Sequence, residues 1–124
     1  MRKKILIIED DTIVRENTAE ILQLANYEVL TAENGREGIN EFRKHHRKIA
    51  AVLLDMTMPQ LGGIDAMREM RKIDSSVPII LVSGYSEVTI ESLASGEQPD
   101  AFVQKPFRVK SLKKCLYGVI GKTN

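Results

Sequence analysis

Residues 50–63, AAVLLDMTMPQLGG, combine a short apolar run, one carboxylate and a glycine-containing loop. The apolar run is too short for a membrane span and is typical of a strand buried on both faces of a parallel sheet. It ends at Asp55, after which Pro59 and Gly62-Gly63 interrupt regular structure before a helical apolar pattern begins at Ile64. The pattern predicts strand, loop and helix, with Asp55 at the strand end where open α/β sheets hold their ligands.

The same alternation of strand and helix extends in both directions along the chain. The predicted strands are Lys4–Ile8, Glu28–Ala32, the run ending at Asp55, Val77–Val82 and Asp100–Gln104. Five helices are predicted. The first begins at Thr12, the second contains Ile39, Phe42 and the basic run Arg43–Lys48, and the third begins near Ile64 and ends near Ile73. The last two cover Glu87–Ser95 and Val109–Ile120. Five strands alternating with five helices predict a doubly wound parallel sheet with right-handed crossovers, in one domain over residues 1–124.

Composition narrows the classes of function. The chain is 43% hydrophobic and 28% charged, which is ordinary for a soluble domain. Its net charge of +1 gives no global field for nucleic acid or acidic membranes, so we expect neither as a direct partner. No apolar run reaches the roughly 18 residues of a spanning helix, and no signal peptide is evident, so we expect a cytoplasmic protein. The single cysteine, Cys115, is predicted to be a packing residue.

Polar side chains follow four of the predicted strands at the point where each strand ends. They are Glu9, Asp10 and Asp11 after the first strand, Asp55 after the third, Ser83 after the fourth and Lys105 after the fifth. Because the carboxyl ends of parallel strands meet at one edge, we expect these side chains to converge there. The acids fall between the first and third strands, where the winding of such a sheet reverses.

This set of residue types indicates a metal-assisted site. Converging carboxylates repel one another, and a hard divalent cation, Mg²⁺ for preference, is the simplest means of holding them together. Flavin or dinucleotide binding is disfavoured, because a phosphate cradle needs glycines and backbone amides rather than acids. With a cation bound, Asp55 could act as nucleophile toward a phosphoryl group, Lys105 could pair with that group, and the Ser83 hydroxyl could donate to it.

Each of these residues also has a simpler interpretation when taken alone. Asp10 or Asp11 could cap the first helix, which is the commoner role of an isolated Asp at that place. Lys105 alone would usually be a solvated lysine. His45 and His46 are neighbours and would point about 100° apart on a helix, which disfavours a shared metal. The combination of four strand ends therefore carries the prediction, rather than any single residue.

Four segments resemble the response regulator receiver domain of two-component signalling. LIIEDD, LLDMTMPQLGG, LVSG and QKPF occur in the order and spacing of that family, and the resemblance covers essentially the whole chain. It implies a flavodoxin-like (βα)5 fold with strand order 2-1-3-4-5. It also implies that Asp55 accepts phosphate from the phosphohistidine of a sensor histidine kinase or histidine phosphotransfer protein. Such a domain is not an enzyme beyond its own phosphorylation and dephosphorylation.

The resemblance also implies roles for the neighbouring residues. Mg²⁺ would be bound by Asp10, Asp55 and the backbone carbonyl of Thr57, with Glu9 acting through water. Ser83 and Lys105 would take the family's hydroxyl and lysine roles, Phe102 would be its switch aromatic residue, and Lys105-Pro106 would be a cis peptide. Glu9, Ser83 and Phe102 replace the more usual Asp, Thr and Tyr. Phosphorylation would change the surface formed by the fourth helix, the fifth strand and the last helix, and so control an unidentified partner or an attached domain.

Some alternatives remain open at this stage. A haloacid dehalogenase type phosphatase also uses a strand-end aspartyl nucleophile with Mg²⁺, but it requires an Asp where this chain has Thr57. A pure interaction module with a vestigial acidic pocket is the second alternative. The segment Ser83–Glu87 with Gln104–Phe107 is similar to the receivers at the carboxyl end of hybrid sensor kinases. A homodimer formed through the last two helices occurs in the family and is left undecided.

Overall fold

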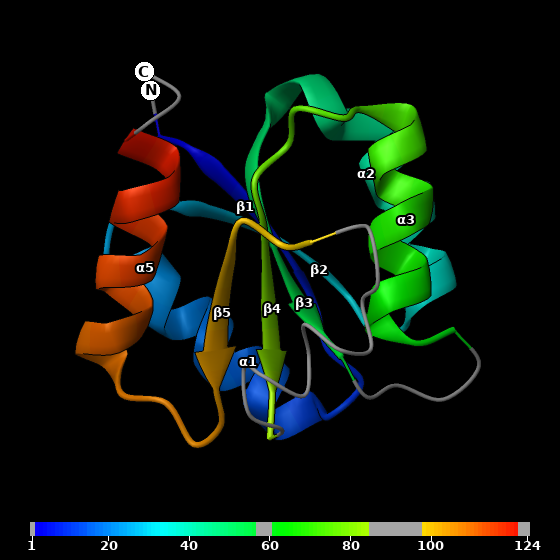
Figure 1. Ribbon diagram of the computed structural model, residues 1–124. Helices are drawn as coiled ribbons and strands as arrows, with labels where there is room; N and C mark the ends of the chain where they lie inside the picture. Colours follow the sequence, from blue (N-terminus) through cyan, green and yellow to red (C-terminus); the bar gives the residue numbers. More distant parts are fainter. Residues whose placement is uncertain (1, 57–60, 85–97, 122–124) are drawn as a thin grey trace.

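The computed structural model describes residues 2–56, 61–84 and 98–121, which form a five-stranded parallel sheet with helices on both faces (Figure 1). The strands are β1 (Lys4–Ile8), β2 (Glu28–Ala32), β3 (Ile49–Asp55), β4 (Ile79–Ser83) and β5 (Ala101–Gln104). Their spatial order is β2-β1-β3-β4-β5, and all four neighbouring pairs are parallel. The predicted flavodoxin-like fold and its strand order are therefore confirmed.

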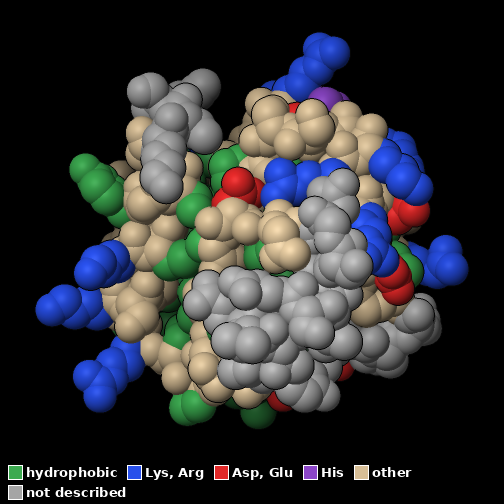
Figure 2. Space-filling view, viewed as in Figure 1, with side chains coloured by type: hydrophobic (Ala, Val, Ile, Leu, Met, Phe, Trp, Pro, Cys, Tyr) green, Lys and Arg blue, Asp and Glu red, His purple; other side chains and the backbone are tan. Residues whose placement is uncertain are grey.

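The described helices divide between the two faces of the sheet. Helices α1 (Thr12–Leu24) and α5 (Val109–Gly121) cover one face, and α2 (Gly35–His45) and α3 (Gly63–Ile73) cover the other (Figure 1). Alternate residues of a strand serve the two cores: Ile5 and Ile7 pack with α1 and α5, whereas Leu6 and Ile8 pack with α2 and α3. Strands β1, β3 and β4 are thus almost continuously apolar because both of their faces are covered. Charged side chains, mainly Lys and Arg, project from the rim of the molecule (Figure 2).

Three predicted boundaries need correction. The basic run Arg43–Lys48 is not one helix, because α2 ends at His45 and a 3-10 turn, η1, covers His46–Lys48. Strand β4 begins at Ile79 rather than Val77, since Pro78 lacks the N–H that a ladder position needs. Strand β5 begins at Ala101, after Asp100.

The predicted helix at Glu87–Ser95 lies outside the described residues. Among the described helices, none is both long enough and apolar enough to cross a membrane.

The connection from β3 to α3 is unusually close. The N–H of Gly63 donates to the carbonyl of Met56 at 2.9 Å. A Cβ at Gly63 would lie 2.6 Å from the carbonyl oxygen of Asp55 and 2.6 Å from the Cα of Met56. Because both neighbours are backbone atoms, only glycine allows α3 to start against the end of β3. The end of β3, and with it Asp55, is thereby held against the first turn of α3.

Candidate functional site

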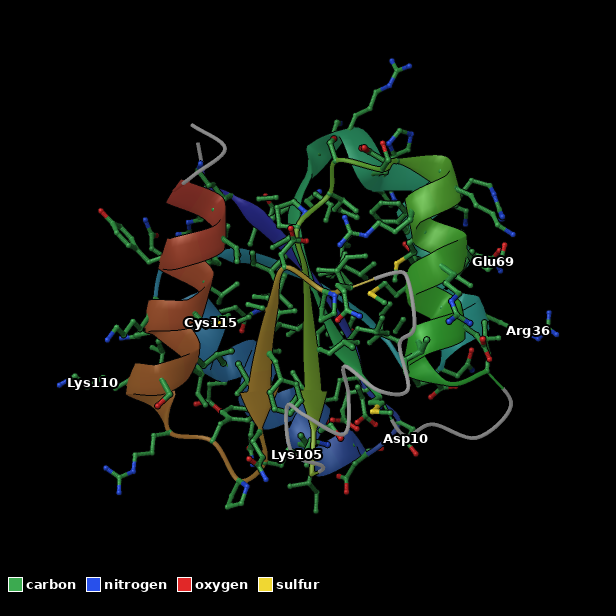
Figure 3. All side chains as sticks on the ribbon, viewed as in Figure 1. Asp10, Arg36, Glu69, Lys105, Lys110 and Cys115 are labelled. Carbon is green, nitrogen blue, oxygen red and sulfur yellow. The ribbon has the colours of Figure 1, made fainter. Side chains whose placement is uncertain are left out.

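The carboxyl edge of the sheet collects the polar strand ends, as predicted from their order in the chain. Glu9 and Asp10 follow β1, Asp55 is the last residue of β3, Ser83 the last of β4, and Lys105 follows β5. Figure 3 shows Asp10 and Lys105 near one another at this lower edge of the sheet, although they come from opposite ends of the sequence. Parallel strands and right-handed crossovers make this convergence possible.

Three carboxylates meet at this edge. Glu9, Asp10 and Asp55 each offer an oxygen atom, and these atoms all lie within 4.8 Å of one another. Glu9 and Asp55 are buried residues, at 5% and 3% exposure, whereas Asp10 is exposed. A cluster of oxygen ligands that is buried on one side and open on the other fits a hard divalent cation such as Mg²⁺.

Among the described residues, one lysine forms ion pairs with the two buried acids. The Nζ of Lys105 lies 2.9 Å from Oε1 of Glu9 and 3.4 Å from Oδ1 of Asp55. Burial alone would lower the pKa of Lys105, but the hydrogen bond to Glu9 and the charges of Asp55 and Glu9 together raise it, so the ammonium stays protonated. The lysine therefore supplies one positive charge to a pocket that holds more than one negative charge.

The charge excess appears directly in the ionisation of Asp55. Burial first, and then the charge of Glu9, raise the pKa of Asp55 to about 7, although Lys105 acts in the opposite direction. The side chains of Glu9 and Asp10 add hydrogen bonds that also raise this pKa. The described residues thus leave Asp55 short of positive charge, which is the condition that a bound cation would relieve.

The structure separates two adjacent acids that residue types alone left open, and it agrees with the family resemblance, which implied Asp10 as the metal ligand. Asp11 is the N-cap of α1, and its Oδ1 accepts a hydrogen bond from the N–H of Val14 at 3.1 Å. Asp10 belongs to the acidic cluster. Arg15 was not among the predicted site residues, and its Nη1 donates to the carbonyl of Glu9 at 2.9 Å. The sequence feature that could have indicated this contact is the position of Arg15 in the first turn of α1, directly after the acidic residues 9–11.

Ser83 is the last residue of β4 at this edge, and Phe102 lies within β5, two residues before its end. Ser83 is fully buried, and its carbonyl accepts a hydrogen bond from the N–H of Lys105 at 2.7 Å. Phe102 lies in β5 opposite Leu81 and packs, partly buried, against the core under α2 and α3. The Lys105-Pro106 peptide is cis, which confirms that prediction. The predicted metal ligand Thr57 lies outside the described residues.

Comparison with known proteins places this geometry in a family. Residues 5–117 match the response regulator receiver domain. The chemotaxis protein CheY of Thermotoga maritima is 35% identical over 119 residues, covering 94% of this chain and 96% of that protein. The probable transcriptional regulator ycf27 of Pyropia yezoensis is 34% identical over 123 residues, covering 99% of this chain and 49% of that protein. The chain therefore spans about half the length of the ycf27 relatives that it matches.

Solved structures agree with the sequence matches. A response regulator receiver domain protein from Clostridium thermocellum has a TM-score of 0.90 and 31% identity, over 97% of this chain and 95% of that one. The receiver domain of the sensor histidine kinase PA1611 from Pseudomonas aeruginosa, described with a magnesium ion coordinated in its active site cleft, has a TM-score of 0.88 over 98% of this chain and 99% of that one. At 24% identity the latter shows the fold alone. The family match over residues 5–117 and the 35% identical CheY establish that this chain belongs to the response regulator receiver domain family of two-component systems.

Proposed function

We propose that this receiver domain accepts a phosphoryl group on Asp55 from the phosphohistidine of a sensor histidine kinase or a histidine phosphotransfer protein. The observation that carries the proposal is the position of Asp55, a buried carboxylate at the end of the central strand β3 with the Lys105 ammonium 3.4 Å away. An Asp55 oxygen would form the new bond to phosphorus while the P–N bond breaks and its electron pair stays on the imidazole. The domain would have no enzymatic activity beyond forming and losing its own aspartyl phosphate.

The neighbouring side chains fit this transfer. Lys105 would pair with an equatorial oxygen of the phosphoryl group as a point charge, and the Ser83 hydroxyl would donate to another. Glu9, Asp10 and Asp55 would hold Mg²⁺, together with the backbone carbonyl of Thr57. When bound, Mg²⁺ would neutralise charge on the transferring phosphoryl oxygens. Positive charge beside Asp55 also lowers its pKa from about 7, which keeps the nucleophile ionised at neutral pH.

The response would be a shift between two conformations. Phosphorylation adds about −1.5 to −2 charges and new acceptor oxygens at Asp55, which would draw Ser83 inward and favour inward rotation of Phe102. The surface beside β5 and α5 would then change, and a partner or attached domain that prefers this surface would read the signal. Residues 1–124 would act as one receiver unit, whether alone or within a longer protein such as a transcriptional regulator or a hybrid kinase.

The test is intact mass after incubation with acetyl phosphate, with and without Mg²⁺. We expect a phosphoryl adduct on the wild type only with Mg²⁺, and none on Asp55→Asn. The matched control is Asp65→Asn, an exposed acid on α3, which should be labelled like the wild type. An adduct that persists in Asp55→Asn would contradict the proposal. Steady turnover of a phosphomonoester by the wild type would instead favour the phosphatase alternative.

Cation binding gives a second readout of the same site. A ligand present at about ten times its Kd stabilises a folded protein by roughly 1.4 kcal/mol. Mg²⁺ should therefore stabilise the wild type and Asp65→Asn against urea, and Asp10→Asn should lose most of this gain. An equal gain in Asp10→Asn would place the cation elsewhere.

A further inference from the structure

The outward side of α5 carries positive charge that the described chain does not neutralise. From Ala101 to the C-terminus the sequence has six Lys and Arg and no Asp or Glu, although the whole chain has 18 cations and 17 anions. Lys110, Lys113 and Lys114 are exposed on α5, and no acidic side chain among the described residues pairs with them. Figure 2 shows Lys and Arg side chains over α5 at the left edge with no Asp or Glu among them, and Figure 3 shows Lys110 pointing outward.

These lysines share one stripe of the helix with an exposed aromatic ring. Residues 110, 113, 114 and 117 follow the spacing i, i+3, i+4 and i+7, which places them on one side of α5. Tyr117, at the end of this stripe, is 78% exposed. The opposite side of the helix packs Leu112 and Leu116 into the core. We call Lys110, Lys113, Lys114 and Tyr117 the basic stripe.

A hollow lies between the basic stripe and the turn that joins α1 to β2. It has a volume of about 500 Å³ and is lined by the four stripe residues together with Ala25 and Tyr27. Tyr27 is half-buried, and its burial raises the pKa of the phenol. Leu24, the last residue of α1, is 81% exposed and immediately precedes Ala25. The hollow thus combines apolar and aromatic walls with a cationic rim, and it is lined by none of the acidic-cluster residues.

We propose that the basic stripe is a docking surface for an acidic segment of a partner protein, which places an apolar side chain against Tyr27 and Tyr117. Charge complementarity supports this occupant, because the lysines find no acidic partner within the described chain. A paired aromatic wall suits one apolar anchor surrounded by acidic residues. Nucleic acid is less well matched, because the stripe contains no Arg for bidentate phosphate contacts and the rest of the chain carries more acids than bases.

The stripe is separate from the side of α5 that borders β5. A second hollow, of about 340 Å³, is lined by residues that include Phe102, Gln104, Ser111 and Cys115. None of its lining residues lines the hollow beside the basic stripe. The two sides can therefore be tested independently. The docking proposal also needs no phosphoryl donor, so its outcome is distinct from that of the phosphoacceptor proposal.

The test is a titration of the ¹⁵N-labelled full chain with a short synthetic peptide of Glu and Ala that has one central Phe. We expect saturable amide shifts centred on the basic stripe, Ala25 and Tyr27. The double variant Lys113→Glu/Lys114→Glu should weaken binding by about tenfold or more, since it reverses two rim charges. The matched control Lys44→Glu/Lys48→Glu makes the same charge change at exposed positions near the end of α2, and it should bind like the wild type.

The aromatic contribution has its own comparison. Tyr117→Ser should weaken binding of the Phe-containing peptide. It should hardly change binding of a matched peptide that has Ala in place of Phe. Since these are exposed positions, unchanged melting temperatures will show that the variants fold.

Four results would overturn the proposal. The first is equal loss of binding in the two charge-reversal variants, which would indicate unspecific attraction. The second is tighter binding of a single-stranded oligonucleotide or of anionic lipid vesicles than of the peptide. The third is self-association in sedimentation that is lost in Lys113→Glu/Lys114→Glu, which would make a second copy of the chain the occupant. The fourth is the absence of saturable shifts at the stripe.

Discussion

The carboxylates at the two ends of the parallel strands differ in how many hydrogen-bond donors and positive charges surround them. At the carboxyl edge, the buried acids Glu9 and Asp55 both pair with the ammonium of Lys105. At the amino edge, Oδ2 of Asp100 accepts hydrogen bonds from the backbone N–H of Ile79 at 2.8 Å and from Nη2 of Arg71 at 2.9 Å. The structural carboxylate Asp100 thus receives hydrogen bonds from a backbone N–H and from a guanidinium. The two buried carboxylates of the candidate site instead share one lysine.

The ionisation of the acids follows the same division. The pKa of Asp55 is raised to about 7, chiefly by burial. The pKa of Asp74, in the loop before β4, is lowered, first by the hydrogen bond from the Ser76 hydroxyl. In the cation-free protein, the ionised form of Asp55 at the carboxyl edge therefore lowers stability. The ionised form of Asp74 at the amino edge raises it. Three substitutions test whether this contrast is real.

The largest effect is expected for Arg71→Ala at the amino edge. The Arg71 side chain is 14% exposed and ties the end of α3 to the segment before β5. Its guanidinium donates to the carbonyls of Ser75, Val77 and Gln98 and to the Asp100 carboxylate. Removing it takes one donor from each of these four acceptors, of which only Asp100 is described with another, the N–H of Ile79, so we expect a loss of about 3 kcal/mol in urea unfolding.

The control for this prediction is the neighbouring Lys72→Ala. The Lys72 side chain is 73% exposed, and its one ion-pair partner in the described part of the chain is Glu69, which lies one turn away on the same helix. Exposed pairs of this kind contribute little, so the loss should stay below about 0.5 kcal/mol. Equal losses for Arg71→Ala and Lys72→Ala would mean that the amino edge is not held by the hydrogen bonds and the ion pair of Arg71.

The second effect is a gain in stability for Asp55→Asn in cation-free buffer. The folded chain holds the Asp55 proton up to about pH 7, whereas the unfolded chain releases it near the ordinary value of 3.8. Wild-type stability should therefore fall as pH rises through this window and stay at its lower level above it. Asn carries no charge, so Asp55→Asn should be more stable than the wild type by about 2 kcal/mol above about pH 7, with little difference below about pH 4.

Urea unfolding in the presence of a chelator, over this pH range, measures the gain. The comparison variant is Asp65→Asn, because Asp65 is exposed and pairs only loosely with Arg68 at 3.6 Å. It should show no such pH-dependent gain. A wild type that is more stable than Asp55→Asn above neutral pH would show that Lys105 alone satisfies the pocket.

The carboxyl edge was predictable from sequence because each strand there passes directly into a polar residue. The sequence changes abruptly from apolar to polar residues where β3 ends at Asp55 and β4 ends at Ser83. Parallel topology then places these strand ends at the same edge of the sheet. Residue types alone did not decide between Asp10 and Asp11, since adjacent acids can both cap a helix, whereas the family resemblance implied Asp10 as the metal ligand, and the structure places Asp10 in the acidic cluster. The roles of the site residues in phosphoryl transfer stay predictions.

The amino edge was not predicted at all. Arg71 and Asp100 are 29 residues apart, and no periodicity links the end of one helix to the residue before a strand. Asp100 was assigned to the fifth strand, whereas its side chain accepts from Ile79 and its N–H donates to the carbonyl of the same residue. His46 likewise contacts Asp74, which lies 28 residues further along the chain. Such pairings depend on distances that only the folded chain defines.

The smallest effect is expected for Ser76→Ala, again at the amino edge. Oδ1 of Asp74 accepts the Ser76 hydroxyl at 2.7 Å and the Ser76 N–H at 3.0 Å, while Oδ2 faces Nδ1 of His46 at 3.3 Å. Removing the hydroxyl should cost about 0.5–1 kcal/mol near pH 7. Ser75→Ala, at an exposed neighbour, keeps the backbone carbonyl that Arg71 uses and should be near neutral.

The pH dependence of this loss decides what it means. Because the folded pKa of Asp74 is lowered, its contribution is present above the ordinary pKa of an Asp and disappears as pH falls through the folded value. The cost of Ser76→Ala in urea unfolding should therefore be largest at neutral pH and should shrink in acid, as the pH falls below the ordinary Asp value of 3.8 and through the lowered folded pKa of Asp74. The stability difference between Asp55→Asn and the wild type should also disappear in acid, but there the variant is the more stable protein at neutral pH, whereas Ser76→Ala is the less stable one. If the Ser76→Ala loss is the same at neutral and at acidic pH, the hydroxyl stabilises the loop without acting on the Asp74 charge, and the contrast between the two edges no longer includes Asp74.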